Sequence, residues 1–163
     1  MIIVKKNGYL KYKNFKFRCA IGKAGIKKKV REGDNITPKG TYKLINILYR
    51  PDRIRNLKTV IKKNKITKKI GWCDDINSKY YNKKIELPNK SRHEKLYRKD
   101  NIYDIIGVLN YNIHPVIKNK GSAIFLHIAK KHYQKTKGCI AIKKIHLKKI
   151  LSVIGKNTKI RIE

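Results

Sequence analysis

The chain has 163 residues, the length of a single domain, and 40% of them are hydrophobic, which is enough to build a buried core. Its net charge of +33 reflects 43 Lys and Arg residues against 10 acidic ones. No apolar run reaches the roughly 20 residues that a membrane span requires, and residues 1–6 lack the apolar core and the cleavage site of a signal peptide. We therefore expect one domain, residues 1–163, without a membrane span.

The charge does not predict a specific nucleic-acid-binding protein. Lysine greatly outnumbers arginine, whereas bidentate recognition of bases and phosphates favours arginine. The basic residues are also spread along the whole chain, which indicates a compositional bias rather than a binding arm. We expect only weak, salt-dependent attraction to anionic polymers. A non-enzymatic basic protein that binds anions or nucleic acid is the alternative from another functional class.

Alternating apolar and polar residues predict short strands along most of the chain. In chain order these segments are residues 1–4, 9–13, 15–21, 41–49, 59–61, 102–109, 123–126, 140–142 and 158–162. The dipeptide Asn7-Gly8 predicts a type I′ hairpin between the first two. Apolar side chains change face after Leu44, and this change of phase predicts a β-bulge.

Two segments predict short helices. Ser91 and Glu94 have the spacing of a capping box, which predicts a helix that runs towards Arg98. Apolar residues recur at helical spacing over residues 147–154, and Gly155 is expected to end that amphipathic helix.

The three cysteines are odd in number and widely spaced, so they do not predict a disulfide framework. Cys19 lies in the apolar row of residues 15–21 and is expected in the core. Cys73 precedes two aspartates, which should disfavour its thiolate. No Cys or His pair has the spacing of zinc ligands, so we expect neither a metal nor a cofactor. Cys139 is therefore the better candidate nucleophile.

Residues 121–142 carry the clearest chemical pattern. An apolar run delivers His127, and a lysine-rich loop then leads to Gly138-Cys139 and a second apolar segment. If the two apolar segments are neighbouring buried strands, the imidazole can remove the proton of the thiol. Gly138 allows a tight turn in which the N–H groups of Gly138 and Cys139 face a developing oxyanion. Lys137 and three loop lysines predict a lowered pKa for the thiol, whereas the structural alternative is a small buried cysteine.

Three further residues are candidates for contacting the substrate. Trp72 is the sole tryptophan and is followed by Cys73-Asp74-Asp75, which indicates either a wall of the substrate groove or a structural turn. Arg98 and Tyr103 could contact a substrate carboxylate, although a surface or core role explains them equally well.

These motifs resemble the active-site signature of the L,D-transpeptidase catalytic domain family. In that family a strand-borne His is followed by Ser or Thr, a basic residue, Gly and Cys, which correspond here to His127, Thr136, Lys137, Gly138 and Cys139. Residues 32–40 resemble the family's Thr-Pro-x-Gly turn before a core strand. Together with residues 71–75 and 110–112, the likeness extends over most of the chain.

The resemblance implies a mostly β fold, a sandwich-like mixed sheet of the L,D-transpeptidase catalytic domain type with one or two short helices. It implies a cysteine acyltransferase that cross-links peptidoglycan and serves cell wall organisation and cell shape. Cys139 would attack the bond between the L-centre of meso-diaminopimelate and D-alanine in a stem peptide, with His127 as the base. An L,D-carboxypeptidase, in which water resolves the thioester, is the close alternative.

The resemblance also implies peptidoglycan stem peptides as partners and a location in the cell envelope or periplasm, and we expect a monomer. The chain departs from the family pattern at two places. Ile128-Ala129 replace the Gly-Thr that usually follows the histidine, and Ala141 replaces an arginine often found after the cysteine. Both positions concern substrate carboxylates, so the donor and the acceptor stay open. In the family a carbonyl or a hydroxyl often orients the imidazole, which makes Thr136 a candidate.

Overall fold

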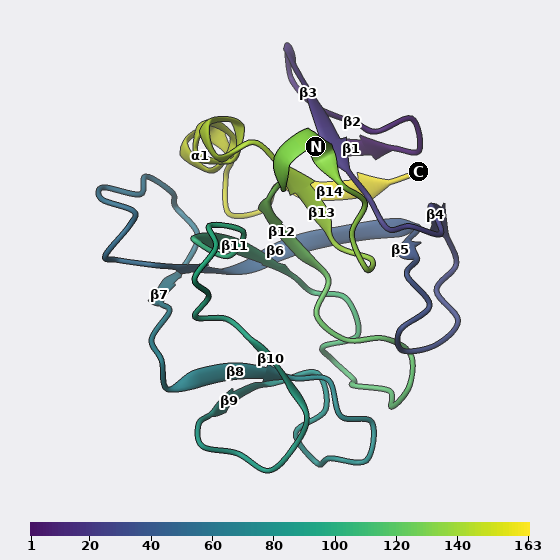
Figure 1. Cartoon of the computed structure of the whole chain (residues 1–163). Coiled ribbons are helices and arrows are strands. Elements are labelled where there is room, and N and C mark those ends of the chain that lie inside the picture. The colour runs from purple at the N-terminus through teal and green to yellow at the C-terminus, as the bar shows by residue number, and fades with distance from the viewer.

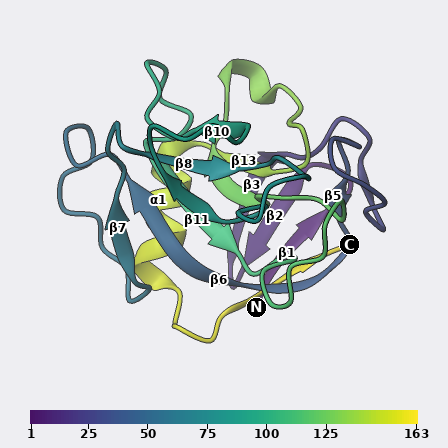
Figure 2. The ribbon, with the colours of Figure 1, turned by 90° about the horizontal axis from the view of Figure 1, so that it is seen from below.

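Nine strands form one mixed sheet in the computed structural model, which describes residues 1–163. In sheet order the strands are β11 (Ile105–Leu109), β12 (Phe125–Ile128), β13 (Ile140–Ile142), β3 (Phe15–Ala20), β2 (Tyr9–Tyr12), β1 (Ile2–Lys5), β14 (Lys159–Ile162), β6 (Gly40–Tyr49) and β7 (Lys63–Lys65). The sheet closes on itself because β11 pairs with β12 on one side and with β6 on the other (Figures 1 and 2). The prediction of a mostly β, sandwich-like mixed sheet is confirmed.

Two local signals in the sequence form the structures that they predict. The strands β1 and β2 make an antiparallel hairpin, and Gly8 adopts the positive φ of 78° that its turn requires. The predicted bulge in β6 is also present, because Val108 pairs with Asn46 whereas the next residue, Leu109, pairs with Leu44. The skipped residue, Ile45, is exposed, so the bulge lets the rest of β6 keep its apolar side chains in the core.

Two predicted elements are wrong. Residues 59–61 do not form a strand, and the neighbouring segment β7 pairs with β6 instead. The capping box at Ser91 does not begin a helix, because the segment forms β10 (His93–Lys95), which pairs with β8 (Ile70–Cys73). The Glu94 carboxylate accepts a hydrogen bond from the Tyr103 hydroxyl rather than from a backbone N–H of its own segment. Pairing with a distant strand therefore overrides the local helical signal.

A second sheet of three strands lies beside the main one, at the bottom of Figure 1. It consists of β10, β8 and β9 (Lys84–Glu86), all antiparallel. A third, two-stranded sheet pairs β4 (Ile26–Lys27) with β5 (Thr37–Pro38) in parallel. The three short strands of the second sheet lie in the segment between β7 and β11, and with β11 the chain rejoins the main sheet.

The two hydrophobic cores lie on opposite faces of β12. Leu126 and Ile128 belong to the larger core, which the main sheet builds together with the helix α1 (Lys144–Val153). Phe125 belongs to the smaller core, which also contains Trp72 of the second sheet and Tyr103. Because side chains alternate along a strand, His127 shares the face of Phe125. The imidazole therefore points towards the smaller core, where the main sheet and the second sheet meet.

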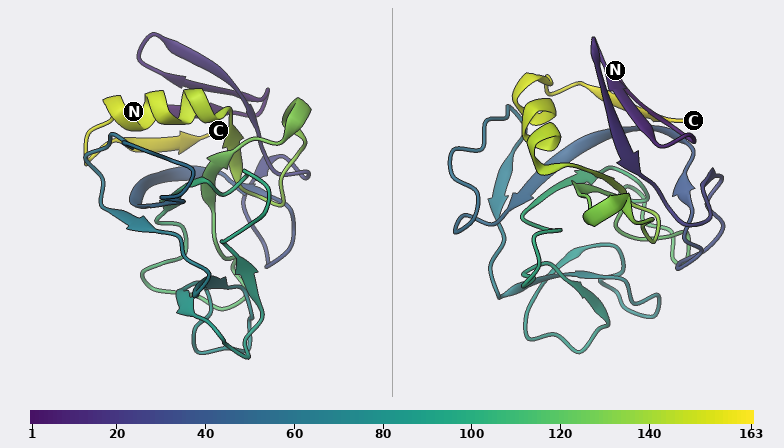
Figure 3. Two further views of the ribbon diagram at one scale, coloured as in Figure 1. Left: turned by 60° about the vertical axis from the view of Figure 1, so that its left-hand side comes forward. Right: turned by 45° about the horizontal axis from the view of Figure 1, so that its top comes forward.

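The only α-helix is the one predicted near the C-terminus, and it lies along the main sheet in Figure 3. Its buried residues Leu147, Ile150 and Leu151 recur at helical spacing and enter the larger core. A 3-10 helix of three residues, η1 (Lys131–Tyr133), is the other helical element. None of the helices has the length and apolar character needed to cross a membrane.

Candidate active site

Cys139 and His127 lie on the same side of two neighbouring strands. The strands β12 and β13 pair in parallel, with His127 opposite Ala141 and Leu126 opposite Ile140. Cys139 immediately precedes β13 and therefore lies at the level of Phe125, on the side of the smaller core. The predicted juxtaposition of two neighbouring buried strands is confirmed.

The thiol of Cys139 is held by the backbone just before and within β12. Its Sγ atom lies 3.3 Å from the carbonyl oxygen of Ala123, to which it donates, and 3.4 Å from the N–H of Phe125, from which it accepts. The side chain is half-buried, whereas Cys19 and Cys73 are buried. Of the three cysteines, Cys139 is thus the least buried residue.

The imidazole of His127 is oriented by its own strand. It is only 6% exposed, and its Nδ1 atom lies 2.9 Å from the carbonyl oxygen of Ile128. Because a carbonyl can only accept, the neutral ring carries its proton on Nδ1 and leaves Nε2 as the basic nitrogen. The ring of Tyr103 packs edge-on against the imidazole, with 5.3 Å between the ring centroids. The orienting group is therefore a backbone carbonyl and not Thr136.

Thr136 instead stabilises the turn that presents Cys139. Its hydroxyl donates to the carbonyl oxygen of Cys139 at 2.6 Å and accepts the N–H of Gly138 at 3.1 Å. Since the Gly138 N–H is already engaged, the N–H of Cys139 is the remaining candidate oxyanion donor in this turn. Gly138 has a φ of +135°, and a Cβ atom there would lie 2.9 Å from the carbonyl oxygen of Ile36. Both observations explain why glycine stands before the cysteine.

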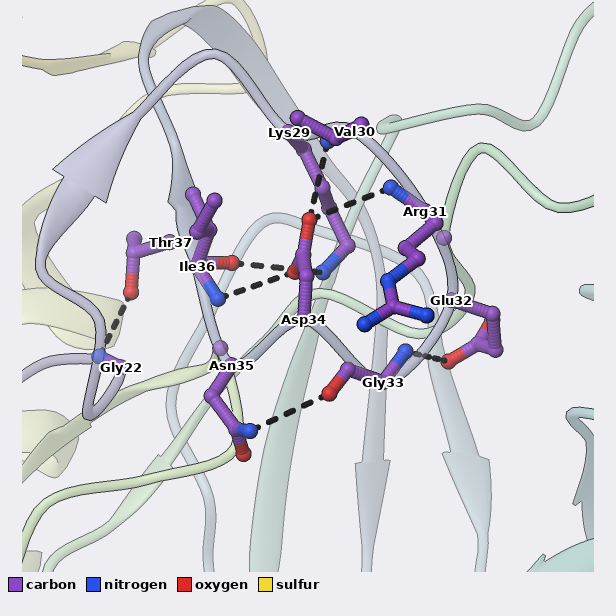
Figure 4. A network of polar contacts seen from close by, with 12 residues as sticks. Gly22, Lys29, Val30, Arg31, Glu32, Gly33, Asp34, Asn35, Ile36 and Thr37 are labelled. Carbon is purple, nitrogen blue, oxygen red and sulfur yellow. Dashed lines mark hydrogen bonds and ion pairs between the residues drawn. The ribbon is translucent and has the colours of Figure 1, made fainter.

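The loop of residues 29–37 that touches Gly138 is itself built around one carboxylate. Asp34 accepts hydrogen bonds from the backbone N–H groups of Val30, at 2.9 Å, and of Ile36, at 3.0 Å (Figure 4). It also forms an ion pair with Lys29, whose side chain is only 3% exposed. This network fixes the segment that resembles a Thr-Pro-x-Gly turn directly beside the Gly138-Cys139 turn.

Burial, and not the neighbouring lysines, dominates the protonation of the pair. Burial raises the pKa of the Cys139 thiol to about 12 and lowers the pKa of His127 to about 4. The prediction that Lys137 and the loop lysines lower the pKa of Cys139 is wrong, because their side chains project into solvent, where their charges are screened. At neutral pH the site therefore holds a neutral thiol and a neutral imidazole.

The profile of the L,D-transpeptidase catalytic domain matches residues 1–162. The chain belongs to this family. The family resemblance drawn from the motifs is thereby confirmed, and the chain is a member of a family of transpeptidases. No curated protein sequence matches the chain significantly.

A solved structure adds a likeness in fold. Bd1075 of Bdellovibrio bacteriovorus is similar to this chain with a TM-score of 0.52 and 18% sequence identity. The match covers 100% of this chain and 47% of that protein, so the chain spans about half of its length. At this identity the likeness concerns the architecture of the L,D-transpeptidase domain alone.

Two of the three predicted substrate contacts, Tyr103 and Arg98, lie near His127, and the third, Trp72, lies beneath β12. Tyr103 touches the imidazole, and the Arg98 guanidinium lies over the Tyr103 ring at 5.4 Å while it pairs with Asp100. Trp72 is 6% exposed and packs edge-on against Phe125, with 5.3 Å between the centroids. Its position is that of a support beneath β12, whereas the aspartate after Cys73 pairs with Arg92 at the surface.

A surface cavity with a volume of about 630 Å³ lies beside Cys19 and Tyr133. It is not lined by Cys139 or His127. Burial raises the pKa of Cys19 to about 12, as expected for a thiol in a core row. This cavity is therefore separate from the candidate pair, Cys139 and His127.

Sequence reasoning missed two residues that shape the site. Asn82 is 1% exposed, and its side-chain carbonyl accepts both the Trp72 indole N–H at 3.0 Å and the Ala123 N–H at 2.8 Å. It therefore ties the second sheet to the residue whose carbonyl receives the Cys139 thiol. The second is Glu94: the capping-box pattern predicts a place in a helix cap, whereas its carboxylate accepts a hydrogen bond from the Tyr103 hydroxyl. Neither role has a local signal, because each depends on contacts between distant segments.

The buried, neutral state of His127 should make stability depend on pH. The fold lowers its pKa from 6.5 to about 4, so the imidazole contributes stability that is fully present above pH 6.5 and is lost as the pH falls through 4. This shift corresponds to about 3 kcal/mol. We expect the free energy of unfolding to fall by about that much more between pH 7 and pH 4 in the wild type than in His127→Gln.

Urea titrations at the two pH values measure this difference. His114→Gln serves as the control, because it makes the same change at an exposed loop residue. Parallel losses of stability in the wild type and in His127→Gln would show that the imidazole is not held neutral by burial.

Proposed function

We propose that the protein is a peptidoglycan L,D-transpeptidase that acts through an acyl-enzyme on Cys139. The observation that carries the proposal is the placement of the least buried of the three cysteines and an imidazole with a free Nε2 on one face of two adjacent parallel strands. Such a pair is the minimal arrangement for nucleophilic acyl transfer. Family membership supports the same reaction class.

The neutral state of the pair sets the order of events. As Sγ of Cys139 attacks the carbonyl carbon, Nε2 of His127 takes the thiol proton, so that the charges arise only in the transition state. The N–H of Cys139 can donate to the oxyanion that develops on the carbonyl oxygen. The imidazolium then protonates the leaving amine of D-alanine, the C–N bond breaks, and a thioester remains on Cys139.

An amine of a second stem peptide resolves this thioester. His127 accepts a proton from the attacking amine and returns it to the departing sulfur, which restores the neutral pair. If water attacks instead, the same residues perform the reaction of an L,D-carboxypeptidase. The proposal includes a site of action in the cell envelope, where stem peptides occur, and a monomeric enzyme.

Incubation of the protein with purified muropeptides tests the proposal. We expect mass spectrometry to show release of D-alanine together with cross-linked dimers in which two diaminopimelate residues are joined. Free tripeptides without dimers would assign the carboxypeptidase reaction. Unchanged tetrapeptides, with a protein that is folded by circular dichroism, would contradict both reactions.

A further inference from the structure

Lys29 is the only lysine of this chain that the fold buries. Its side chain is 3% exposed, and its ammonium forms an ion pair with the carboxylate of Asp34, which is also buried. A buried ion pair is often no more stabilising than apolar residues of the same volume, because both charges must leave water. Stability alone therefore does not explain why a lysine stands at this position.

The ammonium of Lys29 holds a loop carbonyl against the turn of the nucleophile. Its Nζ atom donates to the Asp34 carboxylate and, at 3.4 Å, to the carbonyl oxygen of Ile36 (Figure 4). The N–H of Ile36 donates to the same carboxylate at 3.0 Å, so both polar backbone groups of Ile36 are tied to the ion pair. The Ile36 carbonyl oxygen is the atom that a Cβ at Gly138 would meet at 2.9 Å. The ion pair thus fixes one boundary of the Gly138-Cys139 turn.

The aliphatic part of the same side chain packs against the segment that receives the thiol. A Cβ atom at Gly121 would collide with Cε of Lys29, so the lysine stem lies directly on this glycine. Two residues later, the carbonyl oxygen of Ala123 accepts the Cys139 thiol at 3.3 Å. Ala123 has a φ of +36°, a backbone conformation that a residue with a Cβ keeps only when its surroundings hold it. Lys29 is therefore part of the support on which this acceptor depends.

Lys29 consequently contacts the two sides between which the thiol of Cys139 is held. We propose that Lys29 is a positioning residue that keeps the Gly138-Cys139 turn and the backbone acceptor of the thiol in a fixed mutual arrangement. It takes no part in proton transfer, which belongs to His127. The expected effect on turnover rests on the proposed function, whereas the arrangement itself can be measured without a substrate.

Amide hydrogen exchange, followed residue by residue by NMR, tests this arrangement. Lys29→Met keeps an aliphatic side chain and removes the ammonium. We expect the amides of Phe125 and Gly138, which are bonded to Cys139 Sγ and Thr136 Oγ1, to exchange at least about tenfold faster in this variant. Amides of β1 and β14, which lie in the larger core, should change much less. Equal acceleration in these strands would assign Lys29 a purely stabilising role, and unchanged rates at Phe125 and Gly138 would show no role near the thiol; either result refutes the proposal.

Two further variants separate positioning from charge compensation. Lys28→Met makes the same change at the exposed neighbouring residue and should leave all of these rates unchanged. Lys29→Met combined with Asp34→Asn leaves no unpaired buried charge, and it serves as the test where the single variant does not fold. This double variant still lacks the ammonium that holds the Ile36 carbonyl, so fast exchange at Gly138 should persist. Wild-type exchange in the double variant would show that Lys29 only neutralises Asp34, and the proposal would be overturned.

Turnover of stem peptides is a second readout, and it separates this proposal from the proposed function. In Lys29→Met, kcat for D-alanine release should fall by about fivefold or more with KM unchanged, because a misplaced nucleophile affects the reaction step rather than substrate binding. A raised KM with an unchanged kcat would make Lys29 a binding residue and refute positioning. If the wild type turns over no stem peptide but the exchange pattern holds, the positioning role stands and the proposed function fails. If turnover and exchange are both unaffected in Lys29→Met, the positioning role fails and the proposed function stands.

Discussion

Replacing Cys139 with alanine is expected to abolish turnover of stem peptides and to leave the fold intact. The Sγ atom makes two weak sulfur hydrogen bonds, to the backbone at Ala123 and Phe125, so its replacement by a small side chain removes little stabilising interaction. The reaction, by contrast, has no other accessible thiol, because Cys19 and Cys73 are buried. His127→Ala should be nearly as damaging, with a loss of at least about a thousandfold in kcat, because a nucleophile and its base act as a unit.

Rates of D-alanine release and thermal unfolding curves of the same samples measure both expectations. Cys19→Ala and Cys73→Ala are the matched controls, since they remove the same atom from the other two cysteines and should keep the activity. Retention of more than about one per cent of turnover in Cys139→Ala, with a normal unfolding curve, would place the chemistry on another residue.

The neighbourhood of Cys139 and His127 could be predicted because its signals are local. A strand, a polar loop and a second strand lie close together in sequence, and the connection between them forces the strands to be neighbours. Gly138 likewise predicted a tight turn before Cys139, and its φ of +135° confirms a backbone conformation that favours glycine. The family motif then added the identity of the nucleophile and the base as a hypothesis.

The properties of the pair could not be predicted in the same way. Lysines near Cys139 are visible in the sequence, but the burial that raises its pKa comes from a core that collects Trp72, Tyr103 and Phe125 from distant segments. The capping box at Ser91 failed for the same reason, because β10 gains a partner strand that no local pattern reveals. Sequence patterns thus predicted that the candidate residues lie on neighbouring strands, whereas packing between the two sheets determines their protonation.

A carbapenem is expected to acylate the protein at Cys139 and at no other residue. A strained lactam carbonyl needs an activated nucleophile and an oxyanion donor, and it does not depend on recognition of two peptide strands. The expectation is therefore independent of Ile128, Ala129 and Ala141, where the chain departs from the family pattern. Cys19 and Cys73 should stay unmodified because both thiols are buried in the folded protein.

The pH dependence of this acylation distinguishes a neutral pair from a preformed ion pair. With a thiol pKa of about 12 and an imidazole pKa of about 4, the rate should rise as the pH increases through 4 and stay level from about pH 6 to pH 8. In His127→Ala the base is absent, so acylation should be much slower at pH 7 and should increase by about tenfold per pH unit as the thiolate forms.

Peptide mapping of the adduct and its rate of formation between pH 4 and pH 10 decide the matter. The site of modification and the profile test different statements, because the first concerns the identity of the nucleophile and the second concerns its activation. An adduct on Cys73, or none on a folded sample, would remove Cys139 from its role. A wild-type rate that increases steeply above pH 7 would show that His127 does not take the thiol proton, and the neutral-pair mechanism would then be replaced by attack of a free thiolate.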